Sequence, residues 1–264
     1  MNRREFIDLG LKGLAGILLA SCAPNIKLDE IPYRQKLPGE IKSNIIPGSN
    51  RLVYVIPDRH AYTILGRHDE NVPYQRSIVA LMNYLGEKQE VKMIGLEGEY
   101  REVDGHYLRK DLIDEDLSFE EAADTLISYD SGSALEFLNP DHFYSVGLEN
   151  PFLHFRGFEI ALEIEDLKKI LLDSKNTNEK TSILNKLGKL EKKRVKNLDR
   201  RDAHSIKKLI AEMKFHDFDK AMILFGAKHL PKLQKELEKY KTSWISLNPP
   251  KFVDEYYFEN SLQE

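Results

Sequence analysis

The sequence predicts an α/β fold with a mainly parallel central sheet flanked by helices and a helical insertion before the last strands. Two observations predict it. Five short apolar segments are bounded by polar or turn residues, which is typical of strands buried on both faces. Helical patterns separate these segments, and alternation of strands with helices is typical of parallel sheets. The five predicted strands are Leu52–Pro57, Val91–Glu97, Ser145–Glu149, Ala221–Gly226 and Ser243–Leu247.

Composition supports this fold class and excludes several others. The chain has 264 residues, of which 41% are hydrophobic, so it is long and apolar enough to bury a core. Its single Cys excludes a disulfide scaffold, and its net charge of −4 gives no overall basic field for nucleic acid. No apolar run approaches the roughly 20 residues of a spanning helix, which excludes a polytopic membrane protein.

Helical periodicity fills the intervals between the predicted strands. A lysine-rich section between the third and fourth strands is expected to be a solvated helical hairpin of mixed charge. No aromatic residues alternate with its basic ones, so we expect no nucleic-acid platform there. The predicted helices are Pro73–Gly86, Ser118 to about Tyr129 after a capping-box pattern, Phe155–Leu172, the lysine-rich Asn178–Lys214, and Pro231–Tyr240.

The first residues have the three-part pattern of an export signal. Arg3 and Arg4 open the chain, a short apolar stretch follows over Leu9–Ala20, and a small-residue site precedes Cys22. The site resembles a bacterial lipobox, and the paired arginines resemble a twin-arginine signal, although Asp8 stands where a basic residue is usual. The alternative is an amphipathic helix with a chance Cys.

This pattern predicts the location and domain organisation of the protein. Residues 1–21 are expected to be a lipoprotein signal peptide, 22–50 a tether, and 51–264 the α/β domain, with its helical section at about 153–215. Acylation of Cys22, with palmitate among the chains, would anchor the exported protein to the membrane of the bacterial envelope, on its periplasmic or outer-membrane face.

Ionisable residues follow four of the predicted strands. Ligands of open α/β sheets bind outside the carboxyl ends of the strands, so these residues are expected to converge. Imidazole and carboxylate groups together suit zinc or another divalent metal, here Zn, Mn or Fe, which lowers the pKa of bound water to about 7. The residues at the strand ends are Asp58 and His60, Glu97 and Glu99, Glu149, and His229.

The order of these motifs resembles the EreA/ChaN-like superfamily, which includes the TraB/PrgY/Tiki and ChaN families. The stretch from Gly226 to Pro231 is similar to the C-terminal GxxH motif of the TraB group. Arg201 and Asp202 resemble that group's Arg-Asn pair, with Asp in place of Asn. The segment that ends at Glu97 resembles the superfamily's strand-end glutamate.

At the first strand the likeness is divided between two families. Asp58-Arg59-His60 stands where TraB proteins have GxxH and ChaN proteins have Gly-Glu-x-His. Gln75 stands like the Gln that follows the His in ChaN proteins. The segment Gly147–Pro151 resembles a further strand-end glutamate motif of relatives.

The resemblance implies a site of His60, Glu97, Glu149 and His229, with Arg201 beside it. TraB-like proteins are regarded as metal-dependent peptidases, and EreA-like enzymes are esterases in which a histidine activates water. The resemblance thus implies a hydrolase acting on a small molecule or peptide, in which His60, Glu97 and His229 bind metal or orient water. Glu149 is a further ligand or the base, and Arg201 stabilises an anionic group.

Two alternatives stay open. ChaN-like proteins are haem-binding lipoproteins, so the chain could be a haem or iron carrier without activity. Alternatively, Asp58 and Asp202 could mark a decayed site that serves only as a protein-binding surface. His68 is a weaker candidate for the site, and the remaining histidines are expected to be structural or exposed: His106, His142, His154, His204 and His216.

Overall fold

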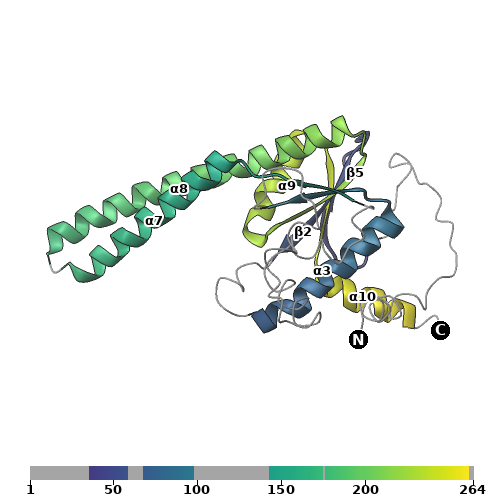
Figure 1. Ribbon diagram of the computed structural model, residues 1–264, viewed down its shortest axis with the longest axis horizontal. Coiled ribbons are helices and arrows are strands. Elements are labelled where there is room, and N and C mark those ends of the chain that lie inside the picture. The colour runs from purple at the N-terminus through teal and green to yellow at the C-terminus, as the bar shows by residue number, and fades with distance from the viewer. Residues whose placement is uncertain (1–35, 59–67, 98–142, 175, 262–264) are drawn as a thin grey trace, which may run out of the picture.

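A six-stranded sheet forms the centre of the molecule in the computed structural model (Figure 1). The structure describes residues 36–58, 68–97, 143–174 and 176–261, with no side chains described at 68–72 and 257–261. The strand order is β1-β6-β2-β5-β3-β4. The strands are β1 (Glu40–Asn44), β2 (Leu52–Asp58), β3 (Met93–Leu96), β4 (Tyr144–Gly147), β5 (Lys220–Gly226) and β6 (Ser243–Leu247).

The predicted α/β fold with a mainly parallel sheet is confirmed. Strands β2 to β6 pair in parallel, and among the described strands only β1 runs antiparallel, against β6. The central strand β2 is buried along its whole length, as its unbroken apolar run predicts. The parallel pairing brings the carboxyl ends of β2, β3, β4 and β5 to one edge of the sheet.

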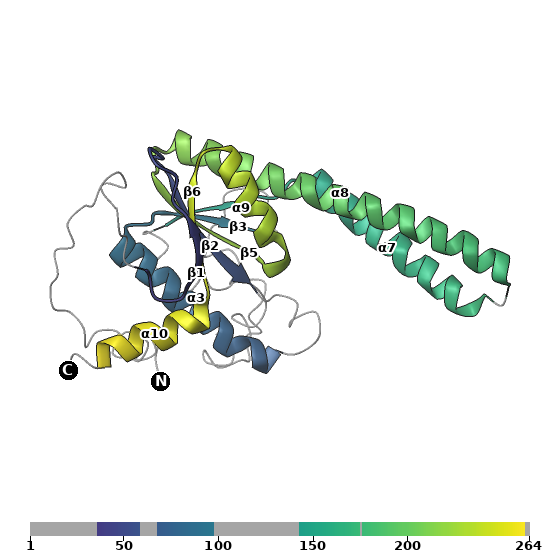
Figure 2. The same ribbon diagram turned by 180° about the vertical axis from the view of Figure 1, so that it is seen from behind.

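Helices cover both faces of the sheet (Figure 2). Helices α3 (His68–Gln89) and α10 (Pro249–Ser261) pack on one face, and α9 (Leu230–Lys239) packs on the other together with the C-terminal half of α8 (Thr177–Phe215). Alternate residues of the strands point to the two faces. Val53 and Val55 of β2 contribute to the core under α8 and α9, and Tyr54 and Ile56 contribute to the core under α3 and α10.

The helical insertion forms an arm that projects from the sheet (Figures 1 and 2). Helix α7 (Pro151–Asp173) packs along the N-terminal half of α8, and Ile160, Ile164 and Leu190 form a small core between them. A hairpin was expected within Asn178–Lys214, but this section is one continuous helix, so the hairpin is formed by α7 and α8 instead. The helical periodicity of the section continues without a break, and Gly188 is accommodated within the helix.

Part of the expected tether belongs to the sheet. Glu40–Asn44 forms the edge strand β1, within the range 22–50 assigned to the tether. This edge strand is mostly exposed or half-buried, and its sequence is polar. It therefore lacks the apolar run by which the buried strands are identified. The turn before β1 contains Gly39 at φ +73°, where a Cβ would lie 2.6 Å from Cβ of Phe252.

Several predicted features lie outside the described residues. They are the signal peptide with Cys22, the helix at Ser118–Tyr129, and the site candidates His60 and Glu99. His68 begins α3, but its side chain is not described. Within the described ranges, the helices include none with the length and hydropathy needed to cross a membrane.

Candidate functional site

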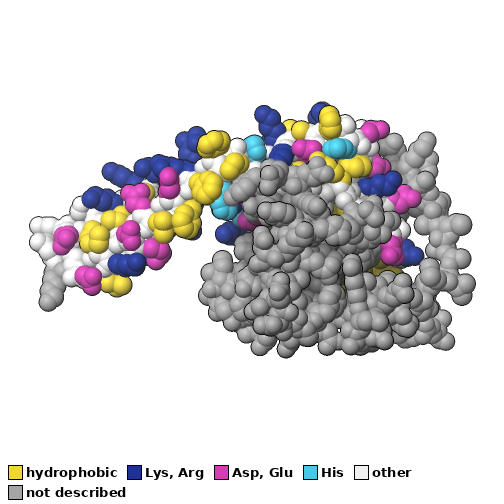
Figure 3. Space-filling view, viewed as in Figure 1, with side chains coloured by type: hydrophobic (Ala, Val, Ile, Leu, Met, Phe, Trp, Pro, Cys, Tyr) yellow, Lys and Arg dark blue, Asp and Glu magenta, His cyan; other side chains and the backbone are white. Residues whose placement is uncertain are grey.

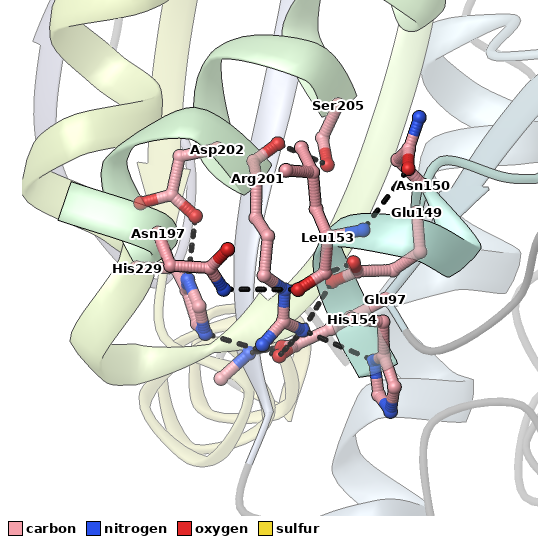
Figure 4. Close-up of polar contacts among 11 residues, drawn as sticks. Glu97, Glu149, Asn150, Leu153, His154, Asn197, Arg201, Asp202, Ser205 and His229 are labelled. Atoms are coloured by element: carbon pink, nitrogen blue, oxygen red, sulfur yellow. Dashed lines mark hydrogen bonds and ion pairs between the residues drawn. The ribbon is translucent and has the colours of Figure 1, made fainter. Parts of the chain in front are cut away.

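Polar side chains from three strand ends and from α8 meet at the carboxyl edge of the sheet (Figure 4). Glu97 follows β3 directly, and Glu149 comes two residues after β4. His229 ends the single helical turn that follows β5. Arg201 and Asp202 reach the same edge from the middle of α8. The predicted convergence of Glu97, Glu149, Arg201 and His229 is therefore present in the structure.

Glu97 is held in place by the end of the neighbouring strand. Its backbone N–H donates to the Leu224 carbonyl oxygen of β5, which continues the ladder beyond β3. Its Oε2 accepts a hydrogen bond of 2.6 Å from the Gly226 N–H. Its other oxygen, Oε1, lies 3.0 Å from His229 Nε2 and 3.9 Å from Arg201 Nη2. One carboxylate oxygen thus fixes the side chain, and the other is directed at the two cationic groups.

His229 is buried between two carboxylates. Its Nδ1 lies 2.6 Å from Asp202 Oδ1, and its side chain is only 1% exposed. On the opposite side of the ring, Nε2 is within ion-pair distance of Glu97 but is not aligned for a hydrogen bond with it. The imidazole is therefore oriented firmly through Nδ1, and its Nε2 faces the carboxylate of Glu97.

The two carboxylates set the protonation of His229. Burial by itself would lower its pKa, but the hydrogen bond with Asp202 and the contact with Glu97 outweigh burial and raise the pKa to about 9. Burial also raises the pKa of Asp202, and His229 opposes that shift. At neutral pH the histidine is thus an imidazolium when no ligand replaces its proton.

Arg201 and Glu149 form a bidentate ion pair beside this group. Arg201 Nη2 lies 2.6 Å from Glu149 Oε1, and Arg201 Nε donates to Oε2 at 3.0 Å. Burial disfavours the charge on Arg201, but the bond with Glu149 outweighs it and raises the pKa, so the guanidinium stays charged. Both oxygens of Glu149 are occupied by Arg201, which makes Glu149 a positioning residue for the guanidinium.

The base of α7 is fastened to α8 next to Arg201. Asn150 caps α7 by accepting the Leu153 N–H, and Asn197 of α8 donates to the Leu153 carbonyl oxygen at 2.9 Å. Gly157 permits this approach, because a Cβ there would lie 2.9 Å from Asn197 Nδ2. The arm therefore joins the domain at the site itself.

Asp58 and Gln75 form a second buried polar pair at the same edge. Asp58 is the last residue of β2, paired in register with Gly226 of β5. Gln75 of α3 donates to Asp58 Oδ1 at 2.7 Å, and its own Oε1 accepts no hydrogen bond within the described structure. Both predicted residues are thus at the sheet edge, on the β2 side.

The structure adds two residues that the sequence interpretation did not assign to the site. Asp202 was singled out only as a departure from the family pattern, yet it orients His229. His154 was expected to be structural or exposed, but its Nδ1 lies 3.4 Å from Arg201 Nη2. Its position one turn into a helix that follows a strand-end glutamate is the only signal in the sequence that could have indicated this.

The side chains of the site supply part of a ligand set for a divalent metal ion. Metal-binding histidines usually have their other ring nitrogen held by a carboxylate, as Asp202 holds His229, and their metal-binding nitrogen lacks a protein hydrogen bond. Nε2 of His229 and Oε1 of Glu97 fit two ligand positions. Among the described residues, no three His, Cys, Asp or Glu side chains are arranged to hold one metal ion. The predicted third ligand, His60, lies outside the described residues.

In comparisons with protein-family models, curated proteins and solved structures, the chain has no significant match. Its likeness to the EreA/ChaN-like superfamily therefore stays a prediction from short motifs.

Proposed function

We propose that this protein is a hydrolase of esters or amides that activates water at the carboxyl edge of its sheet. The observation that carries the proposal is the buried series Asp202–His229–Glu97, with contacts of 2.6 Å and 3.0 Å. Such a series costs free energy, because burial of charged groups is unfavourable even when they are paired. Perturbed ionisable groups of this kind are concentrated at catalytic sites.

The roles of the residues follow from their charges. Glu97 is the base that accepts a proton from water, because its Oε1 is directed into the site while Oε2 is fixed. His229, protonated at neutral pH, donates a proton to the leaving oxygen or nitrogen. Arg201 Nη1 bonds to no described residue, so it can stabilise the negative charge that develops on the carbonyl oxygen.

The reaction balances without an oxidant or reductant. The water oxygen forms a bond to the acyl carbon, and the bond from that carbon to the leaving oxygen or nitrogen breaks. Glu97 takes the proton of the water, and His229 supplies a proton to the leaving group. The products are a carboxylic acid and an alcohol or amine. The acid releases its proton to solvent, and the proton on Glu97 returns to His229, which restores the site.

A divalent ion of Zn, Mn or Fe is the proposed cofactor. His229 Nε2 and Glu97 Oε1 would hold it, with His60 as the predicted third ligand. In the metal-loaded form these two groups would be ligands, so the acid and base roles given above belong to the metal-free site. When bound, the ion would polarise the carbonyl group and lower the pKa of water. Because Nε2 must lose its proton to bind metal, the affinity is expected to rise with pH towards 9.

The test combines metal analysis with hydrolysis of defined probes. Full-length protein purified without chelators is assayed for Zn, Mn and Fe and for hydrolysis of p-nitrophenyl acetate and of a quenched fluorescent peptide library. We expect His229→Gln and Glu97→Gln to lose at least a hundredfold in turnover while circular dichroism stays unchanged. His216→Gln is the matched control, since His216 lies at the far end of α8.

Persistent turnover in His229→Gln would refute the proposal. Haem is tested in parallel by the appearance of a Soret band on addition of haemin. A haem-binding protein without His229-dependent hydrolysis would favour the carrier alternative, and a protein with neither property would favour the decayed site.

A further inference from the structure

We propose that the substrate has an alkyl acyl chain that lies along α7, on an apolar strip formed by Phe155, Phe158 and Leu162. This inference rests on the proposed hydrolase function and adds the substrate class. The three side chains are 61%, 60% and 51% exposed, although each is large and apolar. Exposed apolar groups in contiguous rows usually mark a binding surface.

The strip begins at the site. His154 contacts Arg201 at 3.4 Å, and its ring meets that of Phe155 edge to face at 6.1 Å between centroids. Residues 154, 158 and 162 follow one another at a spacing of four, so they share one face of the helix. Arg201 is itself 3.9 Å from Glu97, so the row leads directly from the reacting groups to the apolar surface.

The direction and length of the strip suit a medium-length alkyl chain. From His154 to Leu162 the helix rises about 12 Å, away from the sheet and along the arm. Figure 3 shows hydrophobic side chains along the face of the arm that α7 presents, with Asp and Glu side chains between them, and Lys and Arg side chains along the upper edge of the arm. A carbonyl group held at Arg201 would thus place its chain along hydrophobic side chains.

The backbone of the strip distinguishes an alkyl chain from a peptide. Within α7 the backbone N–H and C=O groups are used in the helix, so a peptide main chain lying on it would find few partners. An alkyl chain needs no hydrogen bonds, and its affinity rises with each CH₂ group that leaves water. A helix face of Phe and Leu side chains therefore favours the alkyl chain.

The first measurement is binding, which does not require turnover. Decanoate and acetate are titrated by calorimetry, below the micellar concentration, into the full-length chain and into the double variant Phe155→Ser/Phe158→Ser. We expect decanoate to bind at least tenfold more tightly than acetate to the unmodified protein, and the double variant to lose this difference. Phe215→Ser is the matched control, because Phe215 is 82% exposed at the distant end of α8.

The second measurement is the rate of hydrolysis of p-nitrophenyl esters from acetate to decanoate. We expect kcat/KM to rise with chain length in the unmodified protein and in Phe215→Ser, but to be independent of chain length in the double variant. The acetate ester should be hydrolysed at the same rate by the unmodified protein and by Phe215→Ser, and each longer ester is compared with the rate of the same protein on acetate. Circular dichroism and the urea unfolding midpoint of the double variant show whether its fold is intact.

The outcomes separate the strip from the hydrolase proposal. Equal decanoate affinity in the double variant and the unmodified protein overturns the strip, whatever the rates are. His229-dependent hydrolysis that is independent of chain length likewise overturns the strip and retains the hydrolase. Selective decanoate binding without any His229-dependent hydrolysis overturns the hydrolase and supports the strip as a site for acyl chains.

Discussion

Asp202 Oδ1 lies 2.6 Å from Nδ1 of His229 and thereby connects the middle of α8 to the end of β5. The two residues are 27 positions apart in the chain, and both are almost fully buried. In the resemblance to TraB-like proteins, Asp202 replaces an Asn. The contact shows that Asp202 supplies a carboxylate where the imidazole receives its orientation.

Removal of that charge should change the protonation of His229. In Asp202→Asn the side chain keeps its size and an oxygen acceptor but loses the charge that helps raise the histidine pKa. We expect the pKa of His229 to fall from about 9 towards its ordinary value of 6.5. Titration of the imidazole signals by NMR in metal-free protein measures it. An unchanged pKa would show that Glu97 alone controls the charge.

The raised pKa of His229 also predicts a pH dependence of stability. The folded state holds this proton up to about pH 9, whereas the unfolded chain releases it near 6.5. The stabilisation is therefore complete below pH 6.5 and is lost as the pH rises through 9. At about 1.4 kcal/mol for each pKa unit, the loss is roughly 3 kcal/mol. Urea unfolding of metal-free protein from pH 6 to 9.5 should show this loss, and His229→Gln should flatten the profile.

The buried pair of Arg201 and Glu149 predicts a large cost for removal of one partner. Glu149→Gln leaves a guanidinium with 15% exposure without its carboxylate, which is expected to lower the free energy of unfolding by about 3 kcal/mol or more. Glu191→Gln is the control, because its ion pair with Arg194 is exposed and is worth less than about 1 kcal/mol. Similar unfolding midpoints in urea for the two variants would contradict the structural role of Glu149.

Two glycines of the arm offer a matched test of how α7 joins α8. A Cβ at Gly157 would lie 2.9 Å from Asn197 Nδ2, whereas a Cβ at Gly188 would meet nothing within 4 Å. We expect Gly157→Ala to destabilise the protein by about 1–3 kcal/mol, because Asn197 must move. Gly188→Ala should stabilise it by up to about 1 kcal/mol through helix propensity. Thermal unfolding of both variants measures the difference, and equal signs would exclude this account of the junction.

The strands and strand-end residues could be predicted because their signals are local. Leu52–Asp58 is apolar throughout, and Glu97 and His229 are the polar residues at the ends of such runs. Residues at equivalent ends of parallel strands meet whatever the rest of the chain does. This explains why the convergence of these residues at one edge of the sheet could be predicted from the sequence.

The features that could not be predicted depend on contacts between distant segments. His154 reaches Arg201 only because α7 and α8 pack in one particular register, which helical periodicity alone does not fix. β1 was assigned to a tether because the strand is polar and lies at an edge, so it lacks an apolar signal. The bidentate pairing of Glu149 with Arg201 likewise depends on where α8 crosses the sheet edge.

Helix α8 belongs to two structures at once: Leu190 lies in the small core of the arm, and Leu209 lies in the core beneath the sheet. Arg201 and Asp202 lie between these halves, about 36 Å along the helix from its first residue, Thr177. One continuous helix thus connects the arm to the sheet, and the residues of the site lie between its two halves. A displacement of the outer end of the arm would therefore be transmitted along α8 to Arg201 and to the carboxylate that orients His229.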